Sequence, residues 1–292
     1  MTQSVIRKKI WDNSRREAFQ LVFWPKPSRP NGSLVVIHHG LGEHAERFAA
    51  VGLQLVELGF EVRSYDCRGH GQSMGKRGDA AGVDGLIADF EEILPVLIET
   101  TDCKKVVVMG HSMGGAVISR YLTARPVHSK IEAAILSAPA LAVPISPINE
   151  IKLKIGRVLN RYVPTLTLPS GLDVNGISSA PEEVERYHAD KWVHDMVSTR
   201  LGASIVDGSE EILKGAHRLT VPTLLYHGTE DPICDIEGSR RFSRLAPVGM
   251  VAFREIMGGR HELHHEVPTI RDQWWDQLSR WLSHQIKVAK AA

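Results

Sequence analysis

The 292-residue sequence contains only three cysteines: Cys67, Cys103 and Cys234. Their odd number and wide spacing argue against a disulfide framework and favour a reducing compartment. The sequence also lacks any run of about 18 apolar residues, so we expect no transmembrane helix. The first charged residues follow the apolar pair Val5-Ile6, which reverses the order found in a secretory signal. We therefore expect a cytoplasmic protein that is at most peripheral to membranes.

The sequence also has no excess of positive or negative charge. Lys and Arg number 35 and Asp and Glu number 34, which gives a net charge of +1. Nucleic-acid binders usually have a basic surplus, so we expect no nucleic-acid partner. Hydrophobic residues make up 43% and charged residues 24%, which are ordinary globular values that exclude disorder and low complexity. A chain of this length can bury a full core without metal or disulfide staples.

Short apolar runs alternate with helical patterns along most of the chain. Two strand-like stretches, at 4–11 and 17–24, come first. Further strand-like runs then alternate with helix-period patterns, and these runs are 34–37, 60–65, 106–109, 133–137, 223–226 and 251–256. This rhythm predicts an α/β protein, with a mostly parallel sheet covered by helices on both faces.

The rhythm breaks at Pro144 and resumes only at residue 223. No strand-like run interrupts this stretch, which carries short helical patterns at 148–159 and 182–197. We interpret residues 143–219 as a helical cap inserted after the sixth strand. Residues 1–142 and 220–292 then form the two parts of one core domain. A second independent domain is the alternative.

The sequence Gly110-His-Ser-Met-Gly114 has the G-x-S-x-G pattern between a predicted strand and a predicted helix. The glycines permit a sharp turn, which pushes the Ser112 hydroxyl out at the carboxyl edge of the sheet. The N–H groups that follow open a helix, where developing negative charge is favoured. Ser112 is therefore the candidate nucleophile.

A serine nucleophile needs a base and an acid that orients the base, in the chain order serine, acid, base. Asp231 follows the strand 223–226, and His261 follows the strand 251–256. We expect both side chains at the edge that carries Ser112. Neighbouring residues remain alternatives: Glu230 and Asp235 for the acid, and His264 and His265 for the base.

An oxyanion needs two fixed hydrogen-bond donors. One candidate is the N–H of Met113, at the start of the helix. The other is the N–H of Leu41, which follows Gly40 just after the strand 34–37. The alternative for this loop is a simple tight turn.

Two other motifs compete with this assignment. Gly40-Leu-Gly-Glu-His-Ala45 matches a dinucleotide fingerprint, but it leaves Ser112 and its two partners unexplained. His261-Glu-Leu-His-His265 matches the zinc-protease pattern H-E-x-x-H, which requires both histidines on one helix face. Glycines precede this segment and Pro268 follows it, leaving room for only about two helical turns. We therefore expect neither a metal nor an organic cofactor.

These motifs together resemble the monoacylglycerol lipase branch of the α/β-hydrolases, and also lysophospholipase-like and serine-aminopeptidase-like hydrolases. The resemblance runs from about Ile37 to the C-terminal helix. Its motifs are His39-Gly-Leu-Gly-Glu-His44, Asp66-Cys-Arg-Gly-His-Gly-Gln-Ser73, Gly110-His-Ser-Met-Gly-Gly115, Ser137-Ala-Pro-Ala-Leu141 and His261-Glu-Leu-His264. The resemblance implies an α/β-hydrolase fold, the same nucleophile, acid, base and oxyanion donors, and a helical cap lining an acyl channel.

We therefore expect a serine ester hydrolase that acts on monoacylglycerols or similar single-chain lipid esters through an acyl-enzyme. The alternatives are a peptidase or amidase on the same triad, a lysophospholipase, and a non-catalytic use of the fold. The candidate substrate-binding residues are Ile145, Ile148, Leu172 and Ile177. A peptidase would want carboxylates for a substrate amine, and the candidates are Glu150, Asp173 and Glu182. The amphipathic, basic segment 148–161 predicts transient contact with lipid aggregates.

Overall fold

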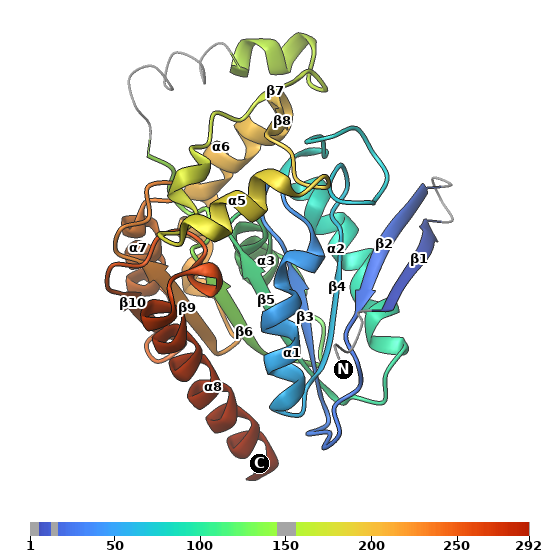
Figure 1. The fold of residues 1–292 in the computed structure, drawn as a ribbon, viewed down its shortest axis with the longest axis vertical. Coiled ribbons are helices and arrows are strands. Elements are labelled where there is room, and N and C mark those ends of the chain that lie inside the picture. Colours follow the sequence, from blue (N-terminus) through green and yellow to red (C-terminus); the bar gives the residue numbers. More distant parts are fainter. Residues whose placement is uncertain (1–5, 13–16, 145–155, 292) are drawn as a thin grey trace.

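The computed structural model describes residues 6–12, 17–144 and 156–291. Its centre is one large sheet, and the strands of this sheet are β1 (Ile6–Asp12), β2 (Glu17–Phe23), β3 (Ser33–His38), β4 (Glu61–Tyr65), β5 (Lys105–His111), β6 (Ile131–Ser137), β9 (Thr223–Gly228) and β10 (Val251–Ile256). Their spatial order is β1-β2-β4-β3-β5-β6-β9-β10 (Figure 1). β2 pairs antiparallel with β1 and β4, and all other neighbours are parallel. The predicted mostly parallel sheet is confirmed.

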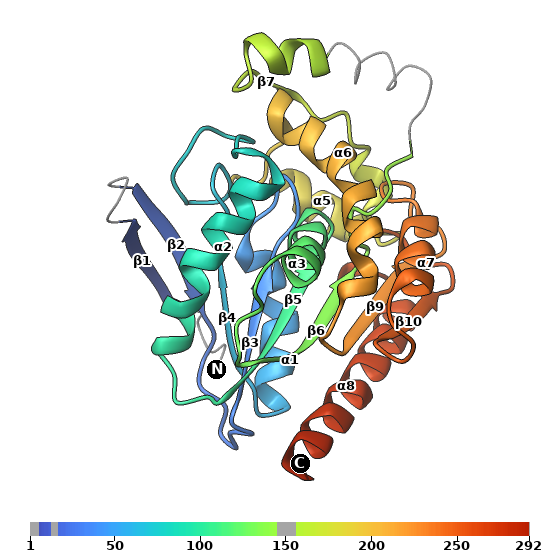
Figure 2. The same cartoon turned by 180° about the vertical axis from the view of Figure 1, so that it is seen from behind.

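Helices cover both faces of the sheet, as predicted (Figures 1 and 2). One face carries α1 (Ala49–Glu57) and α8 (Pro268–Ala291), and the other carries α2 (Gly82–Glu99), α3 (Met113–Ala124) and α7 (Ile236–Leu245). Among the described helices, none combines the length and apolarity that a bilayer-spanning helix requires.

Alternation along the central strands supplies two separate hydrophobic cores. In β3, Leu34 and Val36 belong to the core beneath α2 and α3, whereas Val35 and Ile37 belong to the core beneath α1 and α8. Trp274 of α8 is fully buried in the second core. Because strand side chains point to opposite faces in turn, a continuous apolar run fits a sheet that is covered on both sides.

The chain between β6 and β9 crosses over the carboxyl ends of the parallel strands (Figure 1). We call it the β6–β9 segment, and its described residues are 138–144 and 156–222. Residues 156–162 are helical, and the elements that follow are β7 (Thr167–Pro169), the 3-10 helix η2 (Val174–Gly176), α5 (Pro181–Ala189), β8 (Met196–Ser198), α6 (Thr199–Gly215) and the 3-10 helix η3 (Ala216–Arg218).

Two predictions for this segment are wrong. The sequence predicts no strand here, but β7 and β8 form a short antiparallel pair. The helix expected over 182–197 ends at Ala189 instead. The Asp190 carboxylate there accepts a hydrogen bond from the Trp192 N–H at 2.9 Å, and this local turn competes with further helix. Most of the helix predicted over 148–159 lies outside the described residues.

Candidate active site

Ser112 lies at the sharp turn between β5 and α3. Its backbone is in the left-handed region, with φ of 53° and ψ of −120°, which few non-glycine residues adopt. The Ser112 N–H donates to the carbonyl of Ser137 at 3.0 Å, and the Ser112 carbonyl accepts from Ala140 at 3.0 Å. These bonds to the end of β6 hold the turn, and Ser112 lines a pocket at the carboxyl edge of the sheet.

The turn leaves no room for side chains at the two flanking glycines. A Cβ atom on Gly110 would lie 2.5 Å from the carbonyl oxygen of Gly114. A Cβ atom on Gly114 would lie 2.3 Å from the carbonyl oxygen of His38. The first turn of α3 therefore packs directly on the backbone at the end of β3, as the G-x-S-x-G pattern predicts.

Gly114→Ala should lower the free energy of unfolding by ~2–4 kcal/mol, because the new methyl group clashes with rigid backbone. The matched control is Gly208→Ala in α6, where a Cβ atom meets nothing within 4 Å. That change should raise the free energy of unfolding by ~0.5–1 kcal/mol, since alanine favours helix over glycine. Denaturant unfolding of both variants measures the difference. Equal effects in the two variants would contradict the packing described.

His261 and Asp231 form a buried pair at the same edge. Nδ1 of His261 lies 2.8 Å from Oδ2 of Asp231, and the two side chains are 5% and 0% exposed. Oδ1 of Asp231 accepts from the N–H groups of Ile233 at 2.8 Å and Cys234 at 3.0 Å. The carboxylate orients the imidazole and is itself oriented by the loop after β9.

Each member of this pair stabilises the charged form of the other. Burial favours the neutral acid, but His261 and His227 hold the pKa of Asp231 well below its usual range. Burial also opposes a charged imidazole, yet the Asp231 carboxylate raises the pKa of His261 above its ordinary value. His261 is therefore prepared to accept a proton beside an ionised carboxylate.

His227 is a member of this site that the sequence analysis missed. It is the second-to-last residue of β9 and is fully buried, with Nε2 3.2 Å from Oδ2 of Asp231 and 3.0 Å from the carbonyl of Cys234. Its Nδ1 lies 2.7 Å from Oγ of Ser239. Since both neighbours of Nε2 accept hydrogen bonds, Nε2 carries the proton and donates. The available signal was its place at the end of the strand that precedes Asp231.

The alternative acids and bases face solvent or make other contacts. Glu230 is exposed, and the Asp235 carboxylate caps the start of α7 by accepting from the N–H of Glu237 at 2.9 Å. His264 stacks on Phe48 with ring centroids 4.7 Å apart. Nδ1 of His265 lies 2.6 Å from Oε2 of Glu262.

The two competing motifs do not have the geometry that they require. Residues Leu263–His265 form the short 3-10 helix η4, so His261 and His265 do not share a face of an α-helix. In the Gly40–Ala45 loop, the Glu43 carboxylate accepts from the N–H of Gly40 at 2.5 Å. A pyrophosphate at this loop would meet that negative charge.

The two expected oxyanion donors flank Ser112. Met113 begins α3 and is buried, and Leu41 lines the same pocket as Ser112. Gly40 packs so closely on the serine that a Cβ atom on it would lie 3.1 Å from Cβ of Ser112. Within the described residues, the N–H groups of Leu41 and Met113 have no acceptor of their own. Both are free to bind an oxygen of a substrate.

The pocket lies between the strand ends and the β6–β9 segment. Leu172 and Ile177, two of the expected substrate-binding residues, line it, whereas Ile145 and Ile148 lie outside the described residues. Further apolar lining comes from Leu41, Val174 and Ile233, and polar lining comes from Glu43, His111, Asp173, Tyr187 and Glu262. The free volume of this pocket is about 30 Å³.

Of the carboxylates expected for a substrate amine, only Asp173 is described at the pocket. Glu182 is exposed on α5, and Glu150 lies outside the described residues. His111, beside the nucleophile, is neutral, since burial and the nearby His261 lower its pKa to about 3. Its Nδ1 lies 3.1 Å from the carbonyl of Ser137.

A mostly parallel sheet with a serine at the turn after β5, and with a histidine–carboxylate pair at later strand ends, defines an α/β-hydrolase site. The chain belongs to the family described as "Serine aminopeptidase, S33", whose model matches residues 29–268. It is a serine hydrolase of the α/β-hydrolase fold, and the predicted resemblance is confirmed.

Relatives and solved structures with similar chains agree with this membership. Monoglyceride lipase of Rattus norvegicus is 28% identical over 270 residues, covering 92% of this chain and 88% of that protein. Monoacylglycerol lipase of Mycolicibacterium smegmatis is 28% identical over 244 residues, covering 83% and 85%. The crystal structure of Paleococcus ferrophilus monoacylglycerol lipase superposes with a TM-score of 0.80 at 33% identity, covering 97% of this chain and 99% of that one.

Proposed function

We propose that the chain hydrolyses monoacylglycerols or similar single-chain lipid esters through a Ser112–His261–Asp231 triad. The observation that carries the proposal is the 2.8 Å contact between His261 and the buried Asp231, with His261 and Ser112 lining one pocket. The names of the relatives support the substrate class, because several are monoglyceride or monoacylglycerol lipases.

The proposed reaction proceeds by acyl transfer to the enzyme. Nδ1–H of His261 donates to Asp231, so Nε2 is free to take the proton of Ser112 as its oxygen attacks the ester carbonyl. The N–H groups of Leu41 and Met113 stabilise the oxyanion. His261 then gives its proton to the leaving glycerol oxygen, and next activates the water that releases the fatty acid. No metal or cofactor takes part in these steps.

Residues 143–219 act in this proposal as a cap on the core of residues 1–142 and 220–292. The free volume of about 30 Å³ is well below the roughly 300–1,000 Å³ of a typical small-molecule pocket. We therefore expect Leu172 and Ile177 of the cap to shift when a lipid ester enters. Their apolar side chains then face the acyl chain and keep water from the oxyanion donors.

A peptidase or amidase is the second candidate. Its support is the family description, together with the carboxylates of Glu43, Asp173 and Glu262 at the pocket. Glu43 and Glu262 are, however, already paired with Arg47. A substrate amine would have to compete with that guanidinium, so we favour the lipid ester.

Substrate profiling distinguishes these candidates. We expect kcat/KM for monoacylglycerols to exceed kcat/KM for aminoacyl amides by roughly 10²-fold or more, because the amide lacks a paired site for its amine and has a poorer leaving group. The measurement compares both substrate series with one enzyme preparation. A higher kcat/KM for the amides would replace the ester proposal with the peptidase one.

The cap also supports a proposal for membrane contact. Residues 158–168 expose several large apolar side chains, and these are Val158, Tyr162, Val163, Leu166 and Leu168. Exposed Arg161 lies among them, and exposed Arg157, which pairs with Asp207, directly precedes them. An apolar and basic surface of this kind suits transient docking on anionic lipid aggregates. In this proposal the protein is cytoplasmic and contacts membranes only peripherally.

Replacing Val158 and Tyr162 by serine should lower activity on long-chain monoacylglycerol emulsions about 3–10-fold, because less apolar area docks on the lipid surface. Activity on a soluble short-chain ester should stay unchanged. Val248→Ser is the control, since Val248 is fully exposed between α7 and β10. A parallel loss on both substrates would show that these side chains serve the fold and not docking.

A further inference from the structure

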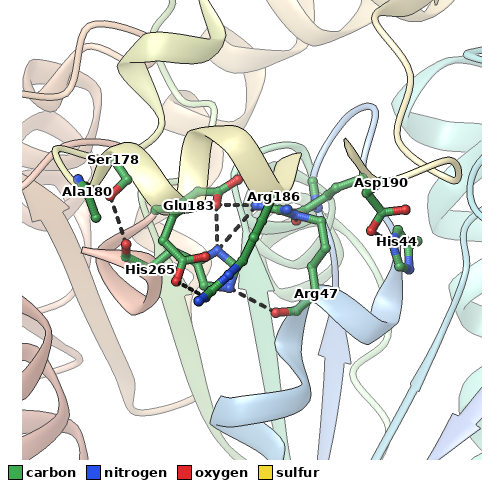
Figure 3. A network of polar contacts seen from close by, with 11 residues as sticks. His44, Arg47, Ser178, Ala180, Glu183, Arg186, Asp190 and His265 are labelled. Atoms are coloured by element: carbon green, nitrogen blue, oxygen red, sulfur yellow. Dashed lines mark hydrogen bonds and ion pairs between the residues drawn. The ribbon is translucent and has the colours of Figure 1, made fainter. Parts of the chain in front are cut away.

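Arg47 is a buried cation held between two buried carboxylates. It lies in the 3-10 helix η1 (Ala45–Phe48), and its side chain is 6% exposed. Its Nε is 3.1 Å from Oε2 of Glu43, and its Nη2 is 2.5 Å from Oε2 of Glu262. The two carboxylates are 3% and 4% exposed. Figure 3 shows Arg47 beneath α5, between His265 and the His44–Asp190 pair.

Each carboxylate is joined to a different part of the reacting site. Oε1 of Glu43 accepts from the N–H of Gly40 at 2.5 Å, and Gly40 precedes Leu41 and packs on Ser112. Glu262 follows His261 directly, and its N–H donates to the carbonyl of Ile177 at 2.7 Å. The Glu43–Arg47–Glu262 bridge therefore connects the loop of one oxyanion donor to the loop of the base.

Other contacts fix the guanidinium in this place. The ring of Tyr187 from α5 lies over it, with 4.6 Å between the guanidinium carbon and the ring centroid. His265 closes the bridge, with Nδ1 2.6 Å from Oε2 of Glu262 and Nε2 3.1 Å from the carbonyl of Arg47. An arginine cannot lose its charge in a protein, and its planar fork holds two partners in fixed directions.

The triad uses only His261 of the H-E-x-x-H motif, and this bridge accounts for its other two members, Glu262 and His265. Glu262, His264 and His265 have ligand atoms within 4.8 Å of one another. A metal ion there would meet the guanidinium of Arg47, which already binds Glu262 and lies 3.3 Å from Nδ1 of His265. Glu262 and His265, the glutamate and last histidine of the motif, therefore contact the guanidinium of Arg47 where a zinc site would have a metal ion.

We propose that Arg47 is a positioning residue that fixes the oxyanion loop relative to His261 through Glu43 and Glu262. Donors stabilise an oxyanion best when they are held in place before the charge develops. The Glu43 carboxylate holds the peptide at Gly40, and Arg47 holds that carboxylate. This inference rests on the proposed Ser112 mechanism and deepens it.

The test uses Arg47→Lys and Glu262→Gln. Lysine keeps the charge but cannot hold two carboxylates in a fork. We expect Arg47→Lys to lower kcat for a soluble short-chain ester about 10–100-fold, with KM within about 3-fold of wild type. The rate of Ser112 labelling by a fluorophosphonate should fall in parallel, because its transition state uses the same oxyanion donors. Glu262→Gln keeps an oxygen acceptor and should lose about 3–10-fold in both rates.

Arg63→Lys is the matched control. Arg63 is also 6% exposed and also binds a carboxylate, Glu61, but it lies in β4 and contacts Leu97 and Thr100. It should leave kcat and the labelling rate unchanged. Wild-type rates in Arg47→Lys and Glu262→Gln, or a change in KM alone, would overturn the inference. If Arg47→Lys does not fold, the near-isosteric Glu262→Gln decides. Failure of Ser112 labelling in the wild-type protein would instead reject the proposed mechanism itself.

Discussion

Replacing Ser112 by alanine should lower kcat/KM for a monoacylglycerol by ~10⁴–10⁶-fold and abolish labelling by a fluorophosphonate. Without the hydroxyl no acyl-enzyme forms, and only binding and the oxyanion donors still favour the reaction. Alanine and serine both carry a Cβ atom, so the backbone strain at φ of 53° is the same in the variant and the wild type. We therefore expect an unchanged unfolding midpoint. The measurements are steady-state kinetics, intact mass after labelling and denaturant unfolding.

Ser119→Ala is the matched control for this experiment. Ser119 lies in α3, the helix that follows Ser112, is fully buried, and donates to the carbonyl of Gly115 at 2.7 Å. Its loss removes one hydroxyl near the site without touching the pocket, so labelling should remain complete. Retained labelling or turnover in Ser112→Ala would contradict the assignment of the nucleophile.

Asp231→Asn should lower kcat/KM by ~10⁴-fold, because the amide no longer holds His261 in the tautomer with Nε2 free. It should also move the pH dependence. The base acts when it is neutral, so activity is lost as the pH falls through the pKa of His261. Asp231 raises this pKa, and the acidic limb of the wild-type profile should therefore lie above His261's ordinary value. In the variant, the limb of the residual activity should lie at lower pH.

Asp235→Asn is the matched control, because it also replaces an aspartate by asparagine, four residues after Asp231. Asp235 is exposed and caps α7, so its loss should leave kcat/KM and the acidic limb near the wild-type values. The kcat/KM profile of each variant from about pH 5 to 9 makes the comparison. An unmoved limb in Asp231→Asn, or an equal shift in both variants, would contradict the role given to Asp231.

The fold could be predicted where apolar patterns alternate with turn residues. The predicted bounds of β10 (Val251–Ile256) agree with the structure, and the helix predicted after the G-x-S-x-G turn is α3 (Met113–Ala124). In parallel sheets the strand ends meet at one edge. That rule alone is enough to expect Ser112, Asp231 and His261 near one another, because each follows a strand.

The β6–β9 segment was harder to predict because tertiary contacts outweigh local patterns there. α6 carries three glycines, Gly202, Gly208 and Gly215, each of which disfavours helix. It forms because Leu201 and other apolar residues are buried, and because the Ser198 hydroxyl caps it by accepting from the Leu201 N–H at 3.2 Å. The pairing of β7 with β8 also depends on a register that three-residue strands do not encode.

The same limit applies to the site residues that the sequence did not indicate. His227 and Ser239 meet across a loop, and Arg47 meets Glu262 across 215 positions of the chain. No periodicity or spacing rule predicts such a contact, since it follows from the packing of η1 against the loop after β10. The motifs gave the reacting side chains, and only the packed structure gave the residues that hold them.

Trapping the acyl-enzyme tests the central claim most directly. The protein is mixed with a monoacylglycerol of defined chain length, quenched in acid within milliseconds, digested and analysed by peptide mass spectrometry. We predict the mass of that acyl group on the peptide that contains Ser112, and its absence when Asp231 is replaced by asparagine and acylation is slow. An acyl group on any other residue, or turnover without acylation of Ser112, would contradict the account.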